Sequence, residues 1–275
     1  MFRRVPDVSF FDDWESYFYP ETYDADRGWG TLVNLFGERD PDRLREIEYR
    51  ETAQREAELK AGAGHLPQTF DAKHLKAIHR YLFQDVYEWA GEYRTVNIAK
   101  HSSSFADFRG GIDSYLADAH RVATLTAWGQ LDHDEFADTA ARVFAYVNQA
   151  HPFREGNGRA SKIFMHDLAR RSHFKLVFGR ISPDVWNQAS EFSGPDLGMY
   201  QPHWQELVPV FRRAAVPRAS GALKPAVEAV RAADIAGQQM GLGPAQMGTP
   251  GPSAGQQPGL PGSVRGTGLE PGAGL

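Results

Sequence analysis

The stretch HPFREGNGR at residues 151–159 constrains the fold of this chain more than any other. Apolar residues recur at helical spacing before and after it, at Phe136, Ala140, Val143, Phe144, Val147, Ile163, Phe164 and Leu168. Pro152 disfavours the α conformation at His151, so the first helix should end there. Gly156 and Gly158 then let the backbone turn before a second helix opens near Gly158. The stretch therefore joins two amphipathic helices.

The second helix presents its amino end to this loop. Unpaired N–H groups at Gly156, Asn157 and Gly158, the positive end of the helix dipole and the Arg159 guanidinium all favour an anion, and phosphate suits them best. A carboxylate such as Glu155 beside phosphate oxygens is typical of a Mg²⁺ ligand. With an ordinary pKa of roughly 6.5, a histidine at this rim can accept a proton from an attacking hydroxyl. His151 is therefore the candidate general base.

Each of these residues also has an ordinary structural interpretation, because a histidine after an apolar helix usually packs and Gly-Asn-Gly is usually a turn. In this order, however, they resemble the motif of the Fic family, His-x-Phe-x-(Asp/Glu)-Gly-Asn-Gly-Arg-x-x-Arg. Lys162 stands in place of the final arginine. The resemblance covers about residues 16–213 and includes an early helix like ERDPDRLREIEYRETAQREAEL. It implies an all-α bundle with a small β-hairpin flap beside the active-site loop.

The resemblance also implies a function and a set of site residues. The expected activity is protein adenylylation, which transfers AMP from ATP with Mg²⁺ to a Ser, Thr or Tyr hydroxyl of a target protein. By matching positions, His151 is the general base, Phe153 a buried anchor and Glu155 the Mg²⁺ ligand. The implied nucleotide and phosphate contacts are Arg154, Gly156, Asn157, Gly158, Arg159 and Lys162. A lysine at 162 keeps the charge but loses the bidentate fork, which leaves room for a different nucleotide.

The segment between Gly91 and Phe105 changes to a two-residue alternation that predicts a hairpin, with a strand over residues 93–98 and a turn at 101–104. One interpretation is a surface flap that merely covers the core. The resemblance instead implies a flap whose edge holds an extended target peptide through main-chain hydrogen bonds. The expected docking residues are Val96, Asn97, Ile98, Lys100 and Phe105.

Further helices follow from capping and periodicity. Asp40-Pro41 should open one that runs to about Lys60, and Asp71 should cap another whose apolar face continues to Trp89. His74 and His79 on that helix are five apart, which is not the spacing of a helical metal pair. Other helices are expected near residues 112–123, after Asp132 with Glu135 completing a capping box, and over 183–193 and 202–211.

Composition limits the remaining classes. The chain has 275 residues, a net charge of −5, a sequence pI near 6.1 and no cysteine, so disulfides and thiol catalysis are excluded and no nucleic-acid or membrane partner is expected. No signal-peptide or membrane-spanning run is present, which favours the cytoplasm and leaves specialised secretion open. We expect an N-terminal arm (1–15) that packs on the domain, a Fic domain (16–213) and a largely disordered Gly/Pro-rich tail (214–275).

Two alternatives to adenylyl transfer stay open: transfer of another phosphate-containing group (phosphoryl, phosphocholine or another nucleotide), and a degenerate domain that only binds nucleotide or a partner. Family members are commonly restrained by a Ser/Thr-x-x-x-Glu-Gly/Asn helix. The nearest match here is TAQREA at residues 52–57, where alanine follows the glutamate. We therefore expect no built-in brake, a toxin-type activity, and a small antitoxin that supplies the glutamate in trans.

Overall fold

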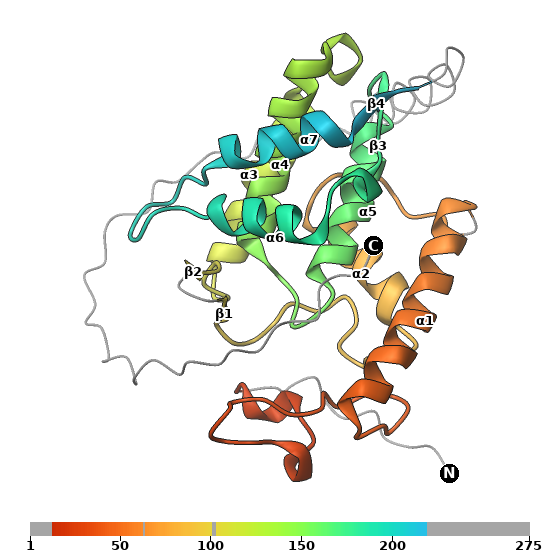
Figure 1. The fold of residues 1–275 in the computed structure, drawn as a ribbon, viewed down its shortest axis with the longest axis vertical. Helices are drawn as coiled ribbons and strands as arrows, with labels where there is room; N and C mark the ends of the chain where they lie inside the picture. The colour runs from red at the N-terminus through yellow and green to blue at the C-terminus, as the bar shows by residue number, and fades with distance from the viewer. Residues whose placement is uncertain (1–12, 63, 101–102, 219–275) are drawn as a thin grey trace, which may run out of the picture.

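The computed structural model describes residues 13–62, 64–100 and 103–218. Its helices are α1 (Pro41–Lys60), α2 (Ala72–Phe83), α3 (Gly111–Leu125), α4 (His133–Ala150), α5 (Asn157–Ala169), α6 (Pro183–Phe192) and α7 (Val208–Ala214). Two short antiparallel pairs join β1 (Ala99–Lys100) to β2 (Ser103–Ser104) and β3 (Phe174–Leu176) to β4 (Ala215–Pro217). Figure 1 shows the helices gathered around α4 and α5. The expected helical fold with a small hairpin is confirmed.

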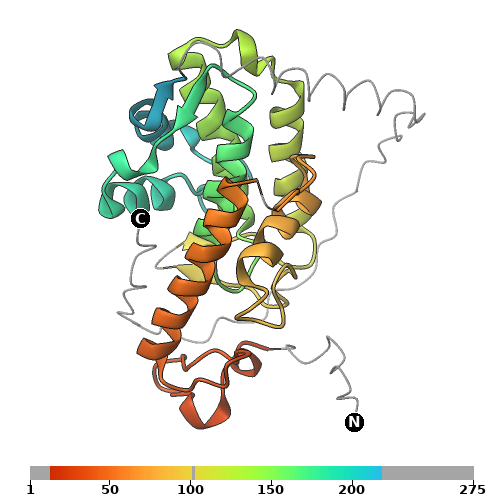
Figure 2. The same ribbon diagram turned by 90° about the vertical axis from the view of Figure 1, so that its right-hand side faces the viewer.

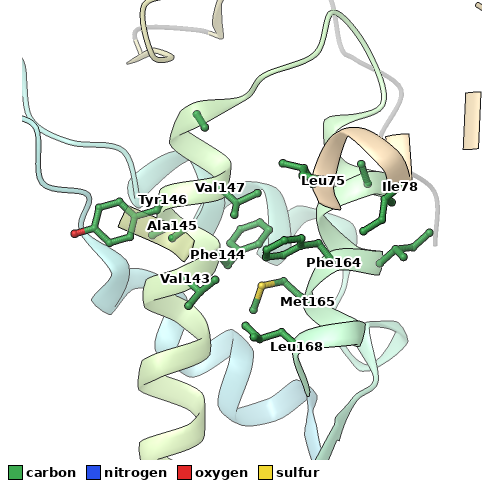
Figure 3. Packing of buried hydrophobic residues seen from close by; sticks show 14 of the residues in the cluster. Leu75, Ile78, Val143, Phe144, Ala145, Tyr146, Val147, Phe164, Met165 and Leu168 are labelled. Atoms are coloured by element: carbon green, nitrogen blue, oxygen red, sulfur yellow. The ribbon is translucent and has the colours of Figure 1, made fainter. Parts of the chain in front are cut away.

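Helix α4 is the centre of the core. Its amino end carries the predicted capping box, in which the Asp132 side chain accepts from the helix and the Glu135 side chain accepts from Asp132 N–H. Its apolar face packs on α5, which in turn packs on α2 (Figure 3). The side chains in this part of the core are Val143, Phe144, Val147, Phe164, Met165, Leu168, Leu75 and Ile78. Close packing on several sides leaves α4 little freedom, so the residue that follows it is held in a fixed place.

Two helix boundaries differ from the expectation. Helix α2 ends at Phe83, although Val86 and Trp89 are buried as the apolar face predicted. Both residues lie in tight turns that fold back onto the core. Their buried side chains therefore continue the helical spacing although the backbone is no longer helical. The segment expected to be helical from Pro202 begins as a 3₁₀ turn at Trp204–Leu207, and α7 starts only at Val208. Pro209 explains this start, because a proline lacks the N–H of an interior position and suits the first turn.

The expected strand over residues 93–98 is wrong, because only residues 99–100 and 103–104 pair as strands. The exposure still alternates, with Arg94 buried and its neighbour Thr95 exposed. This segment lies beside a loop rather than a second strand: Arg94 N–H donates to Pro152 O at 2.8 Å. The two-residue alternation therefore predicted which side chains face inward, but it did not predict what the backbone pairs with.

Both ends of the described chain pack on the domain. Of the expected arm (1–15), residues 1–12 lie outside the described part. Tyr17 and Phe18, which follow it, are buried. Figure 2 shows this segment below the start of α1. At the other end, Ala214 and Ala215 are buried and β4 pairs with β3, so ordered structure extends past the expected boundary at residue 213. The rest of the expected tail, 219–275, lies outside the described residues.

Within residues 13–62, 64–100 and 103–218, no helix combines the length and apolar composition that crossing a membrane requires.

Candidate active site

His151 follows directly on α4 and has an unusual backbone. Its N–H still donates to Val147 O at 3.2 Å, while its φ of +38° lies in the left-handed region that non-glycine residues rarely adopt. This conformation reverses the chain at the start of the motif loop (residues 151–158). The imidazole is half-buried, and the Phe105 ring stacks on it with centroids 3.7 Å apart and planes at 19°. Both the main chain and the ring of His151 are therefore fixed.

The motif loop closes on itself through Asn157. The side-chain carbonyl of Asn157 accepts from Phe153 N–H at 2.9 Å, and its amide donates to Phe153 O at 2.8 Å. Phe153 is fully buried and stacks on the His79 ring at 3.8 Å. The resemblance implies that Asn157 contacts phosphate; in this structure its side chain holds the loop together.

His79 supports the loop from α2. Because a carbonyl can only accept, Nε2–H donates to Glu155 O at 2.9 Å, and Nδ1 accepts from Gly91 N–H at 2.8 Å. Both ring nitrogens are thus used by one neutral tautomer. Burial lowers the pKa of His79 to about 3, so the ring stays neutral around pH 7. The spacing of His74 and His79 indicates no metal pair and does not predict this supporting role. The place of His79 among Leu75, Ile78 and Leu82 on the apolar face is the signal of its burial.

Gly156 occupies the N-cap of α5 with a φ of +80°. A Cβ built there would lie 2.2 Å from the Phe83 ring, so only glycine fits. The expectation of an unpaired N–H at Gly156 is wrong, because this N–H donates to the Glu155 carboxylate at 2.8 Å. The first helical bond runs from Ala160 N–H to Gly156 O, so the N–H groups of residues 157–159 precede the helical ladder. The predicted positive helix end is therefore present beside Glu155.

Arg159 belongs to a polar network with α1. Its guanidinium forms a very short contact with the Glu48 carboxylate, donates to Thr52 Oγ1 at 3.1 Å and lies 3.5 Å from Glu155 Oε1. Glu48 is buried and also accepts from the Tyr87 hydroxyl. Burial raises the pKa of the Glu48 carboxyl, the Arg159 charge lowers it, and the neighbouring Glu155 raises it.

The sequence reading missed Glu48, Thr52 and Tyr87 as partners of Arg159. The signal available was spacing, since Leu44, Glu48 and Thr52 recur every four residues and form the buried face of α1. A helix whose inward face is largely polar needs a polar partner, and nothing local in the sequence says which one.

Arg154 and Lys162, the two other predicted cationic contacts, lie outside the polar network of Arg159. The Arg154 guanidinium lies 3.9 Å from the centre of the Trp14 ring, toward the N-terminal segment. The Lys162 ammonium lies 5.2 Å from the centre of the Trp186 ring, one helical turn beyond Arg159. Burial lowers the pKa of Lys162, and the Glu56 charge acts against that shift. Arg159 and Lys162 thus face α1 and α6 along one side of α5.

Of the predicted flap residues, the structure brings Phe105 directly to His151. Asn97 serves the flap itself, because its side-chain carbonyl accepts from Phe108 N–H at 3.1 Å. Ile98 O accepts from Phe105 N–H at 3.2 Å, and Val96 O accepts from the Arg94 side chain at 2.7 Å. The backbone of Lys100 is in β1. In the described part of the chain, no three His, Asp or Glu side chains gather closely enough to form a metal site by themselves.

Sequence comparison places this site among known proteins. The model of the Fic/DOC family matches residues 69–169, which include α2, the flap and the motif loop. Protein adenylyltransferase VbhT of Bartonella schoenbuchensis is 36% identical over 177 residues, or 64% of this chain and 35% of VbhT. The probable protein adenylyltransferase Fic of Salmonella typhimurium is 31% identical over 181 residues, or 64% of this chain and 83% of that protein. This chain therefore aligns with about a third of VbhT and most of the Salmonella protein.

Solved structures agree with the sequence matches. The BepC protein of Bartonella tribocorum, a VirB-translocated effector solved with bound AMPPNP, has a TM-score of 0.62 at 26% identity and covers 74% of this chain and 98% of its own. The N-terminal Fic domain of a Bartonella quintana effector with bound ADP has a TM-score of 0.62 at 27% identity, covering 74% and 96%. Taken with the motif loop and the fold, these matches show that the chain belongs to the Fic/DOC family.

Proposed function

We propose that this chain is a protein adenylyltransferase that transfers AMP from ATP to a Ser, Thr or Tyr hydroxyl of a target protein. The observation that supports it best is the motif loop, which places a fixed histidine and the positive end of α5 at the two ends of one short turn. The relatives VbhT and Salmonella Fic carry this activity in their names, and BepC binds AMPPNP, an ATP analogue.

In the proposed reaction, His151 takes the proton of the target hydroxyl. The hydroxyl oxygen forms a bond to the α-phosphorus of ATP, the bond between that phosphorus and the α–β bridging oxygen breaks, and pyrophosphate leaves. The N–H groups at the start of α5 neutralise phosphate charge, and Lys162 adds a cation farther along the helix. Such transfers depend mainly on positioning and charge, which one rigid loop supplies.

Glu155 fits the proposed Mg²⁺ ligand. Its side chain is 31% exposed and lies beside the amino end of α5, where phosphates are expected. A single carboxylate suffices because Mg²⁺ usually takes its other ligands from phosphates and water. When bound, the ion would supply positive charge to the phosphates, while His79 keeps the Glu155 backbone in place.

Labelled ATP tests the proposal. Purified chain incubated with a cell lysate and ATP labelled at the α-phosphate should leave label on protein, and ATP labelled at the γ-phosphate should not. Phosphoryl transfer would give the opposite pattern, and a domain that only binds nucleotide would give neither. A His151→Ala sample controls for label introduced by the lysate.

Lys162 gives a separate prediction. An arginine at this position restores a two-pronged cation, so we expect Lys162→Arg to tighten ATP binding or raise the rate of transfer. Calorimetry with ATP measures the first effect and the α-label assay the second. Lys175→Arg on β3 is a matched change far from the loop and should alter neither. Weaker ATP binding by Lys162→Arg would show that the position does not meet phosphate.

We also propose that restraint comes from outside the chain. Glu56, the nearest match to an inhibitory glutamate, forms its ion pair with Lys60 at 2.5 Å within α1 and acts on Lys162 through its charge. A small antitoxin would instead supply a glutamate in trans. Arg159 is already held by Glu48, so Lys162 is the better placed cation for that glutamate.

Because the proposal places no inhibitory glutamate within the chain, the purified chain should label itself, and Glu56→Gly should label itself to the same extent. Glu46→Gly is the matched control, because it places the same helix-weakening residue at an exposed site of α1. Auto-labelling from α-labelled ATP is the measurement. A silent parent that Glu56→Gly alone activates would establish an internal brake.

A further inference from the structure

Arg94 is a buried cation that donates to backbone carbonyls rather than directly to a carboxylate. Its side chain donates to His151 O at 2.8 Å, to Val96 O at 2.7 Å and to Ala150 O at 3.4 Å, and it forms a very short bond to Ala106 O. The residue is 2% exposed. One guanidinium therefore holds four carbonyls from segments that are far apart in the sequence.

These carbonyls belong to two places. Ala150 and His151 form the junction of α4 with the motif loop, whereas Val96 and Ala106 lie on either side of the β1–β2 hairpin. The main chain adds to the link, since Arg94 N–H donates to Pro152 O at 2.8 Å. Arg94 thus connects the flap directly to the start of the motif loop, alongside Ala106 N–H, which donates to Gln149 O at 2.9 Å.

Only arginine suits this role. Its planar fork carries five N–H donors in fixed directions, whereas a lysine has three donors at one point and cannot span four carbonyls. Burial lowers the pKa of Arg94 to about 10, and the Asp107 charge opposes the shift, so the side chain remains charged at pH 7. Burying a cation is costly, and an apolar side chain would fill the same space at lower cost. An arginine at this position therefore indicates a role in aligning the segments around it rather than in filling space in the core.

We infer that Arg94 is a positioning residue that sets the orientation of the His151 imidazole. It does so by two routes. The bond to His151 O fixes the left-handed backbone from which the ring projects, and the bond to Ala106 O fixes the neighbour of Phe105, whose ring stacks on the imidazole. For the transfer reaction the inference rests on the proposed function; for the geometry of His151 it does not.

Arg94→Lys is the first test. In the α-label assay it should lower kcat by about tenfold to a hundredfold and leave the KM for ATP within about twofold, because a small misplacement of a reacting group costs rate rather than binding. The matched control is Tyr17→Phe, which removes the hydroxyl bonds to the adjacent Thr95 and leaves His151 untouched. It should keep the parental kcat. A purely structural role for Arg94 would lower kcat and ATP binding together, which would overturn the inference.

A second readout needs no activity. In nucleotide-free protein, NMR of the His151 ring protons reports the stacked Phe105 ring through its ring current, and Arg94→Lys should shift these signals while Tyr17→Phe should not. Unchanged His151 signals in Arg94→Lys would contradict the inference. If the parent labels no protein, the proposed function fails, and the NMR comparison still decides the role of Arg94.

Phe105→Leu covers the case in which Arg94→Lys does not fold. It removes the stacked ring and keeps Arg94, so it should lower kcat without weakening ATP binding. Combined with Arg94→Lys, the two losses should be less than additive, since both act on one ring. A parental kcat in Phe105→Leu would show that the stack does not orient the base.

Discussion

Replacing His151 with alanine should leave ATP binding intact and reduce labelling of target protein by about 10²- to 10⁴-fold, the usual contribution of a general base. The imidazole is half-buried at the rim, so its loss leaves no large cavity in the core. His151→Asn is the sharper variant, because asparagine adopts the left-handed backbone of this position readily. Calorimetry with ATP and the α-label assay separate binding from transfer.

The control for this prediction is His203→Ala. His203 is an exposed histidine beside Asp196 and outside the motif loop, and its loss should leave labelling at the parental rate. Transfer by His151→Asn at that same rate would remove His151 from the role of base.

Gly156→Ala is expected to cost about 2–5 kcal/mol of unfolding free energy and most of the activity. About 1–2 kcal/mol comes from placing a Cβ at φ +80°, and about 1–3 kcal/mol from overpacking, because the new atom would lie 2.2 Å from the fully buried Phe83 ring. The helix end and Glu155 move with Gly156, so phosphate binding should weaken as well. Urea unfolding measures the stability.

Gly198→Ala separates the two contributions. Gly198 has nearly the same φ, +79°, but open space around it, so its substitution should cost only the backbone share of about 1–2 kcal/mol. Equal losses at the two glycines would show that Phe83 moves aside and that contact with its ring does not restrict position 156.

Local signals were enough for the elements around the site. A proline after His151, the capping box at Asp132 and Glu135, and apolar spacing on both sides of the motif predicted where α4 ends and where α5 begins. Each of these signals acts within a few residues along the chain, so sequence alone contains it.

The residues that support the site could not be predicted in this way, because each is far from its partner along the chain. Arg94 and His151 are 57 positions apart, His79 and Glu155 are 76 apart, and Glu48 and Arg159 are 111 apart. Periodicity reports that a side chain faces inward and carries no information about its partner. The flap illustrates the limit, because its alternation was right about exposure and wrong about the pairing strand.

The pairing of β3 with β4 determines where the described chain leaves the domain. Arg218 N–H donates to His173 O at 2.8 Å, just beyond the carboxyl end of α5, while the motif loop lies at its amino end. A helix of 13 residues is about 20 Å long. Figure 1 shows β3 and β4 near the carboxyl end of α5. An affinity handle, fluorophore or further domain joined after Arg218 would therefore start at the end of α5 opposite the motif loop and His151.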